Sequence, residues 1–157
     1  MYSNTALIQP FYFRTIDRFF SQLIKEGGII QRFEEGVQAI TVSVKILNNG
    51  SYTIEGTFDK ISSGFVNVGY IFPQKSISHK VLMDKSKAVI ERLISVGHIG
   101  NAEITFFKDI HERLYLENVQ LYWTKIGHSL TYFKFLTGGS FNQMGEFMTK
   151  ISNEEEE

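Results

Sequence analysis

The chain has 157 residues, of which 43% are hydrophobic and 21% charged, and it contains no cysteine. These values predict one globular domain over residues 1–152, and they exclude disulfides, thiolate catalysis and cysteine-ligated zinc. The formal net charge of −1 provides no overall field that would attract nucleic acid or an anionic membrane. Because no segment is apolar enough to span a bilayer and no signal-like N-terminus is present, we expect a soluble, cytoplasmic protein.

A helix is predicted near the start of the chain. It would begin at Pro10, carry apolar side chains at spacings of three and four, and end at Gly27 and Gly28. A short β-prone segment, residues 29–33, follows it. Residues 37–47 then alternate apolar and polar side chains, which is typical of a half-buried strand.

The strongest turn signal is Asn49-Gly50, because this pair accepts the positive φ angles of a tight hairpin turn. Residues 37–58 are therefore predicted to form a β-hairpin. Residues 59–64 read as a loop in which Asp59 and Lys60 form a solvated turn, the alternative being contact with a ligand. A third strand is expected over residues 65–72.

The second half of the chain predicts a helix, two strands and a last helix. Ser76 or Ser78 would cap the first of these helices, and Gly97 would end it. Strands are expected at residues 102–107 and 114–122, followed by a polar loop that holds His128 and a short apolar helix capped by two glycines. The fold class predicted is α+β, an antiparallel sheet of about five strands with helices packed on one face. Residues 153–157 would form an acidic disordered tail.

Several landmarks in this order resemble a known family. They are residues 56–60 (GTFDK), 69–74 (GYIFPQ), 96–100 (VGHIG) and the block 114–139. Together they resemble the C-terminal region of the ATP-grasp fold, and more closely its version in IQ-motif-containing protein H, a family linked to cilia and sperm flagella. The resemblance covers nearly all of residues 2–140.

The resemblance also implies where a nucleotide and metal site would lie. Active ATP-grasp enzymes hold Mg²⁺ with an Asp or Glu on one strand and a Glu-x-Asn on the last strand. The matching positions here are Thr105, Asn118 and Gln120, and His128 matches a histidine of the following loop. A hydroxyl and two amides lack the charged oxygens that Mg²⁺ prefers, so the site is expected to be vestigial, without a metal.

Glu117 is the one nearby carboxylate on the last strand, and strict alternation would point it away from Asn118 and Gln120. A one-residue bulge in that strand would bring Glu117 into the site. The other histidines, His79, His98 and His111, have no zinc-ligand spacing.

Two functions from different classes are consistent with these observations. The first is a non-enzymatic interaction module, a degenerate ATP-grasp lobe that binds other proteins as a scaffold in a ciliary or flagellar (axonemal) assembly. The aromatic content of 14% would then include an exposed docking patch. This module would require no cofactor, although residual binding of ATP and Mg²⁺ is left open. It would bind neither nucleic acid nor membrane. The alternative is one wall of an ATP-dependent ligase or nucleotide-sensing site that another polypeptide completes.

Overall fold

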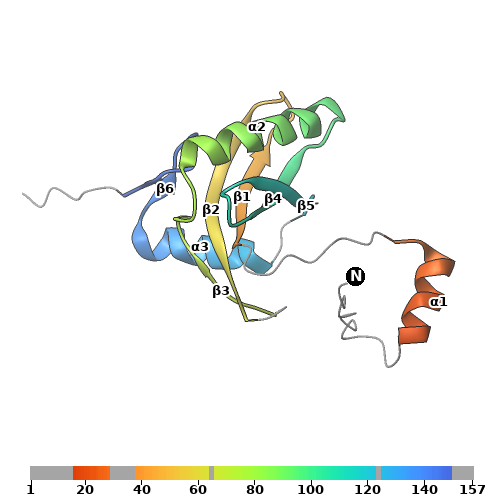
Figure 1. Ribbon diagram of the computed structural model, residues 1–157. Coiled ribbons are helices and arrows are strands. Elements are labelled where there is room, and N and C mark those ends of the chain that lie inside the picture. Colours follow the sequence, from red (N-terminus) through yellow and green to blue (C-terminus); the bar gives the residue numbers. More distant parts are fainter. Residues whose placement is uncertain (1–15, 29–37, 64–65, 123–124, 150–157) are drawn as a thin grey trace, which may run out of the picture. The chain divides into compact units, whose positions relative to one another are not determined.

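A computed structural model describes residues 16–28, 38–63, 66–122 and 125–149 of the chain (Figure 1). Residues 1–33 and 34–157 form two compact units, and each is described by itself. In the first unit, the helix α1 (Ile16–Glu26) ends where the sequence predicts. Gly27 has a φ of 76°, and its N–H donates to the Leu23 carbonyl over 2.8 Å. The predicted start of this helix at Pro10, the segment 29–33 and the tail 153–157 lie outside the described residues.

The second unit is built on a five-stranded antiparallel sheet with the strand order β3-β2-β1-β4-β5. The predicted α+β class is confirmed. The strands are β1 (Gln38–Ile46), β2 (Tyr52–Ser63), β3 (Val66–Ile71), β4 (Gly100–Lys108) and β5 (Leu114–Gln120).

The predicted hairpin is formed by β1 and β2, which pair from Ile46↔Tyr52 to Ile40↔Asp59. Gly50 takes a φ of 77° in the turn, as the sequence predicts. β2 is longer than expected, however, because it continues through residues 59–63 and pairs there with β3. Asp59 and Lys60 are therefore strand residues and not a solvated turn.

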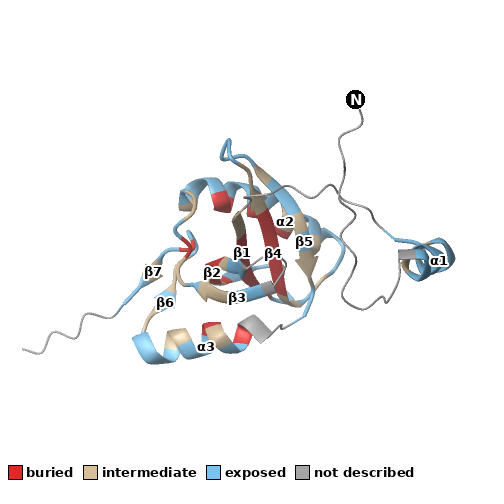
Figure 2. Ribbon diagram, turned by 60° about the horizontal axis from the view of Figure 1, so that its bottom comes forward, coloured by how far each residue is buried: buried red, intermediate tan, exposed pale blue. Residues whose placement is uncertain are grey.

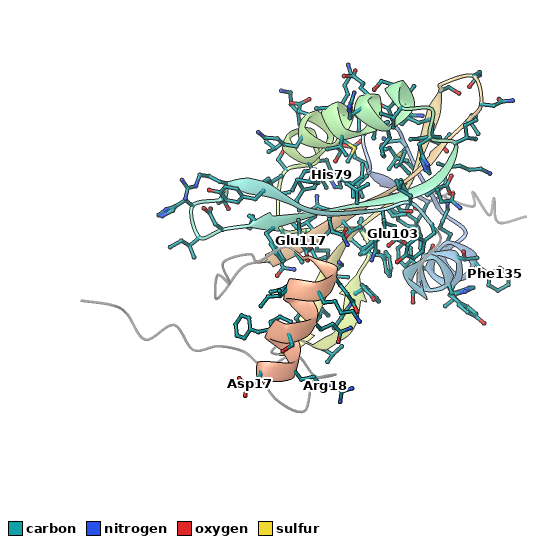
Figure 3. All side chains as sticks on the ribbon, turned by 90° about the vertical axis from the view of Figure 1, so that its right-hand side faces the viewer. Asp17, Arg18, His79, Glu103, Glu117 and Phe135 are labelled. Atoms are coloured by element: carbon teal, nitrogen blue, oxygen red, sulfur yellow. The ribbon has the colours of Figure 1, made fainter. Side chains whose placement is uncertain are left out.

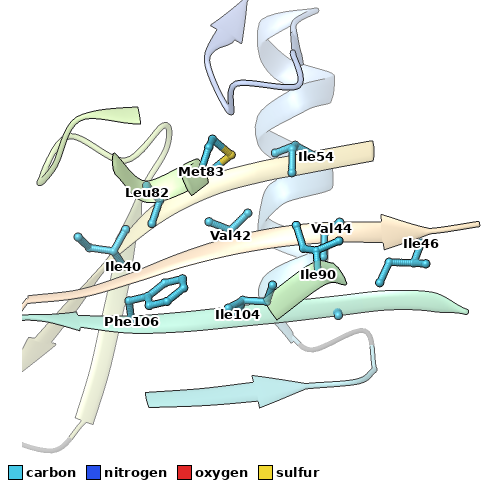
Figure 4. Packing of buried hydrophobic residues seen from close by; sticks show 11 residues of the cluster. Ile40, Val42, Val44, Ile46, Ile54, Leu82, Met83, Ile90, Ile104 and Phe106 are labelled. Atoms are coloured by element: carbon cyan, nitrogen blue, oxygen red, sulfur yellow. The ribbon is translucent and has the colours of Figure 1, made fainter. Parts of the chain in front are cut away.

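One face of the sheet packs against the helix α2 (His79–Ser95). Ser78 occupies the N-cap position of α2, but its side chain makes no cap hydrogen bond, and Gly97 follows the C-cap with a φ of 79°. Figure 4 shows aliphatic side chains of β1, β2 and β4 packed against the buried side of α2. Each fully buried Ile, Leu or Val contributes roughly 1.5–3 kcal/mol by leaving water. The core members are Ile40, Val42, Val44, Ile46, Ile54, Leu82, Met83, Ile90, Ala102, Ile104 and Phe106.

The helix α3 (Lys125–Thr137) lies on the opposite face from α2 (Figure 1). Leu130 of α3 is 2% exposed and packs directly over Gly56 of β2. Gly56 pairs with Ser43, whose neighbours Val42 and Val44 point into the α2 core. The helices, expected on one face of the sheet, therefore cover both faces.

Aromatic rings connect α3 to the sheet. Phe58 contacts Phe72 at a centroid distance of 5.3 Å, and Phe72 stacks on Phe133 of α3 at 5.3 Å. Phe133 in turn contacts Phe147 at 4.7 Å. Phe147 belongs to a small antiparallel pair, β6 (Ser140–Phe141) and β7 (Phe147–Met148). The high aromatic content of the sequence is thus used in part to attach α3 and this pair to the sheet.

The turn between β6 and β7 returns to the α2 side of the sheet. The Thr57 hydroxyl donates a hydrogen bond to the Gly145 carbonyl over 3.1 Å.

Within the ranges that the structure describes, no helix is long and apolar enough to cross a membrane.

Candidate nucleotide-binding face

Polar side chains gather on the face of the sheet opposite α2. Val42 of β1 is buried in the α2 core, so its neighbours Thr41 and Ser43 point to the other side. The strand register extends this face across β4 and β5. On β4, Thr105 pairs with Thr41 and Glu103 pairs with Ser43. On β5, Asn118 pairs with Thr105 and Gln120 pairs with Glu103. We call this surface the polar face; its members are Thr41, Lys60, Tyr70, Glu103, Thr105, Glu117, Asn118 and Gln120.

A hydrogen-bonded network of three side chains lies on the polar face. The hydroxyls of Thr41 and Thr105 are 2.9 Å apart and share a hydrogen bond. Lys60 reaches over β1 from β2, and its ammonium donates to Thr105 Oγ1 over 3.3 Å. Thr41 and Thr105 are both buried. The hydroxyl of Thr105 is therefore already bonded to a hydroxyl and to a cation.

Glu103 carries a carboxylate into the same region, although it is only 4% exposed. Tyr70 pairs with Lys60 across β2 and β3. Burial raises the pKa of the Tyr70 hydroxyl above its ordinary value, and the negative charge of Glu103 raises it further, while a hydrogen bond from Asn67 opposes both.

The last strand contains a bulge at Glu117. Thr105 pairs with Asn118, but the next residue, Phe106, pairs with Leu116, so Glu117 is an extra residue in β5. Glu117 and Asn118 both lie opposite Thr105, which breaks the strict alternation of side chains. Figure 3 shows Glu117 and Glu103 on the side of the sheet away from α2. Glu117 Oε2 is buried and has no hydrogen-bond partner.

The structure brings together some of the site residues that the sequence predicts. Thr105, Asn118 and Gln120 share the polar face. His128 does not lie in a loop, because α3 begins at Lys125 and includes it. Its side chain is exposed, and no contact in the described part of the chain joins it to the other three residues.

Sequence reasoning missed the contribution of Lys60 and Glu103 to this face. Glu103 is detectable from the sequence, because it lies two residues before Thr105 on one strand and therefore points the same way. The contact between Lys60 and Thr105 gives no such signal. It depends on the strand order, in which β1 lies between β2 and β4.

The polar face does not fit a Mg²⁺ ion at Thr105. Mg²⁺ requires an octahedral set of hard oxygens, usually with carboxylates. Here a lysine ammonium is bonded to the Thr105 hydroxyl, and Asn118 and Gln120 offer neutral amides, so the carboxylates of the polar face are those of Glu103 and Glu117 alone. Over the described ranges, no group of three or more His, Cys, Asp or Glu side chains is arranged to hold a metal ion.

Comparison with solved structures identifies the class of fold. One match is the biotin carboxylase domain of Hydrogenobacter thermophilus 2-oxoglutarate carboxylase, crystallised with MgADP. Its TM-score is 0.63 and its sequence identity 14%, and the match covers 82% of this chain and 29% of the carboxylase chain. N5-carboxyaminoimidazole synthetase from Staphylococcus aureus, complexed with ADP, matches with a TM-score of 0.53 and 18% identity over 69% of this chain and 27% of its own. At these identities the two matches show a shared fold, so the sheet and its helices are folded like part of these two proteins.

The particular family follows from the sequence. The sequence model of the IQCH-like ATP-grasp family matches residues 1–144, and the chain belongs to that family. A comparison with curated proteins found no match. The chain spans only 27–29% of the length of the two solved proteins named above.

Proposed function

We propose that this chain is a non-enzymatic interaction module, an ATP-grasp-like lobe that acts as a scaffold in a ciliary or flagellar assembly. The observation that carries the proposal is the outer side of α3. Tyr132, Phe135 and Leu136 are 69%, 82% and 78% exposed, and their spacing of three and four places them on one side of the helix. Figure 3 shows Phe135 pointing away from the sheet, and Figure 2 shows exposed residues along α3 beside the buried ones that face the sheet.

Exposed apolar side chains that cluster in this way are typical of protein-binding surfaces. Aromatic residues are also the most common energetic anchors in protein interfaces. We call Tyr132, Phe135 and Leu136 the α3 patch. The ciliary part of the proposal comes from the family to which the chain belongs, and the partner would be another protein of the same assembly.

We also propose that the chain alone catalyses no ATP-dependent reaction and needs no cofactor. This is supported by the neutral side chains at Thr105, Asn118 and Gln120, and by the lysine that is bonded to the first of them. An active ATP-grasp site would require charged ligands for the metal and further phosphate-binding groups.

The test is the location of the tagged full chain in ciliated cells. We expect the wild-type chain to accumulate along the axoneme and the variant Y132S/F135S/L136S to be diffuse in the cytoplasm. A matched control, V96S/I110S, changes two exposed apolar residues outside the α3 patch, and it should localise like the wild type. Equal melting temperatures of the purified proteins would show that the fold is intact. Axonemal accumulation of the α3 variant, or none of the wild type, would refute the proposal.

A second function is favoured by the composition of the polar face. Lys60 supplies a positive charge and Gln120 a hydrogen-bonding amide on one side of the sheet, so the chain would form one wall of a nucleotide-sensing or ligase site that further polypeptide completes. Titration with Mg-ATP, followed by calorimetry and by melting temperature, tests this function. A nucleotide at a hundred times its dissociation constant would add about 2.7 kcal/mol of stability. Binding that Q120A abolishes would favour this function, and no heat up to millimolar ATP would argue against it.

A further inference from the structure

The tip of the β1–β2 hairpin carries a side chain that is placed for chemical modification. Asn49 is the one asparagine of the sequence that is followed by glycine. Its side chain is exposed, and so are those of Asn48 and Ser51. An asparagine before glycine can lose its amide without an enzyme, because glycine has no Cβ that would hinder the approach of its backbone nitrogen to the asparagine side chain.

The reaction is an attack of the Gly50 nitrogen on Cγ of Asn49. A bond forms between these two atoms, the bond from Cγ to Nδ2 breaks, and ammonia leaves with the proton of the Gly50 N–H. The cyclic imide that results then takes up one molecule of water, which opens the ring to aspartate or to isoaspartate. Only water and the chain's own groups are consumed.

The hairpin stabilises the charge that this attack creates. As the nitrogen adds to Cγ, negative charge develops on Oδ1 of Asn49. That oxygen already accepts two hydrogen bonds from Ser51, one from the backbone N–H over 3.0 Å and one from the hydroxyl over 2.7 Å. Donors that are in place before the charge appears lower the barrier to such an addition.

One hydrogen bond of the turn opposes the reaction. The Gly50 N–H donates to the Leu47 carbonyl over 3.0 Å, so this bond must open before the nitrogen can lose its proton. The opening is local, because the turn is exposed and both bonds from Ser51 to Asn49 lie within residues 49–51. Asn49 therefore keeps its two donors while the Gly50 nitrogen becomes available.

We propose that Asn49 is a site of spontaneous deamidation and that Ser51 is the positioning residue that sets its rate. Aspartate at residue 49 would add a negative charge to the hairpin tip. Isoaspartate would also lengthen the main chain of the turn, and so loosen the pairing of the Leu47 N–H with the Ser51 carbonyl, which are 2.8 Å apart. This chemistry is independent of the α3 patch and of the polar face.

The experiment is incubation of the purified full chain at neutral pH, followed by peptide mass spectrometry. Conversion raises the mass of the peptide that contains Asn49 by about 1 Da, and water enriched in heavy oxygen labels the new carboxylate. Two asparagines serve as internal controls. Asn48 is exposed in the same turn but precedes asparagine, and Asn142 accepts the N–H groups of Met144 and Glu146 but precedes glutamine.

We expect Asn49 to convert at least about tenfold faster than Asn48 or Asn142 in the folded chain. The variant S51A removes one of the two donors and should slow the conversion about three- to tenfold, less than in a closed enzyme site because water replaces the hydroxyl. The variant S51T keeps both donors and should convert like the wild type. In chains unfolded by urea, the wild type and S51A should convert at equal rates.

Two results would overturn the proposal. One is a folded wild-type chain whose Asn49 stays intact while the urea-unfolded chain converts, since the bond to Leu47 would then protect the site. The other is a folded S51A that converts as fast as the wild type, since Ser51 would then not set the rate. If S51A does not fold, S51V, which has the shape of threonine without the hydroxyl, replaces it, and the same two results decide the question.

Discussion

Leu130 of α3 lies directly over the α-carbon of Gly56 on β2. A β-carbon added at Gly56 would be 2.5 Å from Leu130 Cδ1 and 2.9 Å from Leu130 Cδ2. Such distances are far below van der Waals contact, so α3 can approach the sheet this closely only because residue 56 has no side chain. This contact sets the position of α3, and with it that of the α3 patch.

Substitution of Gly56 with alanine should therefore destabilise the fold. Leu130 is buried and its side chain has little room to move, so the added methyl group should lower the free energy of unfolding by about 1–3 kcal/mol. Urea denaturation measures the change. The variant L130A should cost about 2–5 kcal/mol because it leaves a cavity.

The double variant G56A/L130A provides the control. The methyl group added at residue 56 would occupy part of the space that Leu130 vacates, so the two costs should sum to more than the cost of the double variant. If the costs were strictly additive, the direct contact would not determine the packing of α3.

The hydroxyl pair Thr41 and Thr105 leads to a second prediction. The variant T105V would leave the Thr41 hydroxyl and the Lys60 ammonium without the hydrogen-bond partner that they share, which should cost about 1–3 kcal/mol. The variant T41V/T105V should cost less than the sum of the two single variants, because the hydroxyl pair is then removed as a unit. The control T137V removes an exposed hydroxyl of α3 and should change the stability by no more than about 0.5 kcal/mol. A T105V chain as stable as the wild type would contradict the network.

Much of the fold could be predicted from the sequence, because its signals are local. Asn49-Gly50 accepts the backbone of a tight turn. The alternation in residues 37–47 shows which side chains of β1 enter the α2 core, although the strand is not half-buried as expected, because Thr41 and Ser43 on its other side are buried as well. For the same reason Thr105 and Glu103 share a face, as do Asn118 and Gln120. These relationships depend on residues that are close in the sequence.

The rest depends on long-range contacts that the sequence does not reveal. The bulge at Glu117 is one extra residue in a strand, and its position is fixed by pairing with β4. The contact between Lys60 and Thr105 requires that β1 lie between β2 and β4. The placement of α3 opposite α2 depends on the pairing of Gly56 with Ser43. The polar residues around His128 predict a loop, although this histidine lies in the first turns of α3.

The ion pair between Glu55 and Lys134 should make stability depend on pH. Lys134 Nζ lies 2.9 Å from Glu55 Oε2, and both side chains are less than a third exposed. Burial raises the pKa of Glu55, but the hydrogen bond and charge of Lys134 outweigh burial and hold the pKa below its ordinary value of 4.5. Because the folded state lowers this pKa, the contribution of the pair is present above pH 4.5 and is lost as the pH falls through the folded value.

The wild-type chain should therefore lose about 1 kcal/mol more stability than E55Q between about pH 6 and pH 3, the size expected for a partly exposed ion pair. Urea denaturation at several pH values measures this difference. The variant K134M should reduce the same pH dependence. An E55Q chain with the pH profile of the wild type would show that the pair contributes nothing to folding.

The turn between β4 and β5 is organised by Asp109. Its Oδ1 accepts the N–H groups of His111 and Arg113, each over 2.9 Å, and its Oδ2 accepts Arg113 Nε over 2.8 Å. Burial raises the pKa of Asp109, but these hydrogen bonds and the guanidinium charge prevail and lower the pKa from 3.8 to about 2. All of these interactions favour the ionised carboxylate.

NMR titration of the carboxyl group should therefore give a pKa near 2 for Asp109 in the folded chain. Because the folded state lowers this pKa, the carboxylate stabilises the turn fully above pH 3.8, and this stabilisation is lost as the pH falls towards 2. The variant R113M should raise this pKa only part of the way to 3.8, because the backbone N–H groups of His111 and residue 113 still donate to Oδ1. The control K80M, which breaks an exposed pair on α2, should leave the titration of Asp109 unchanged. A pKa that returns fully to 3.8 in R113M would mean that the guanidinium, and not the turn, keeps Asp109 ionised.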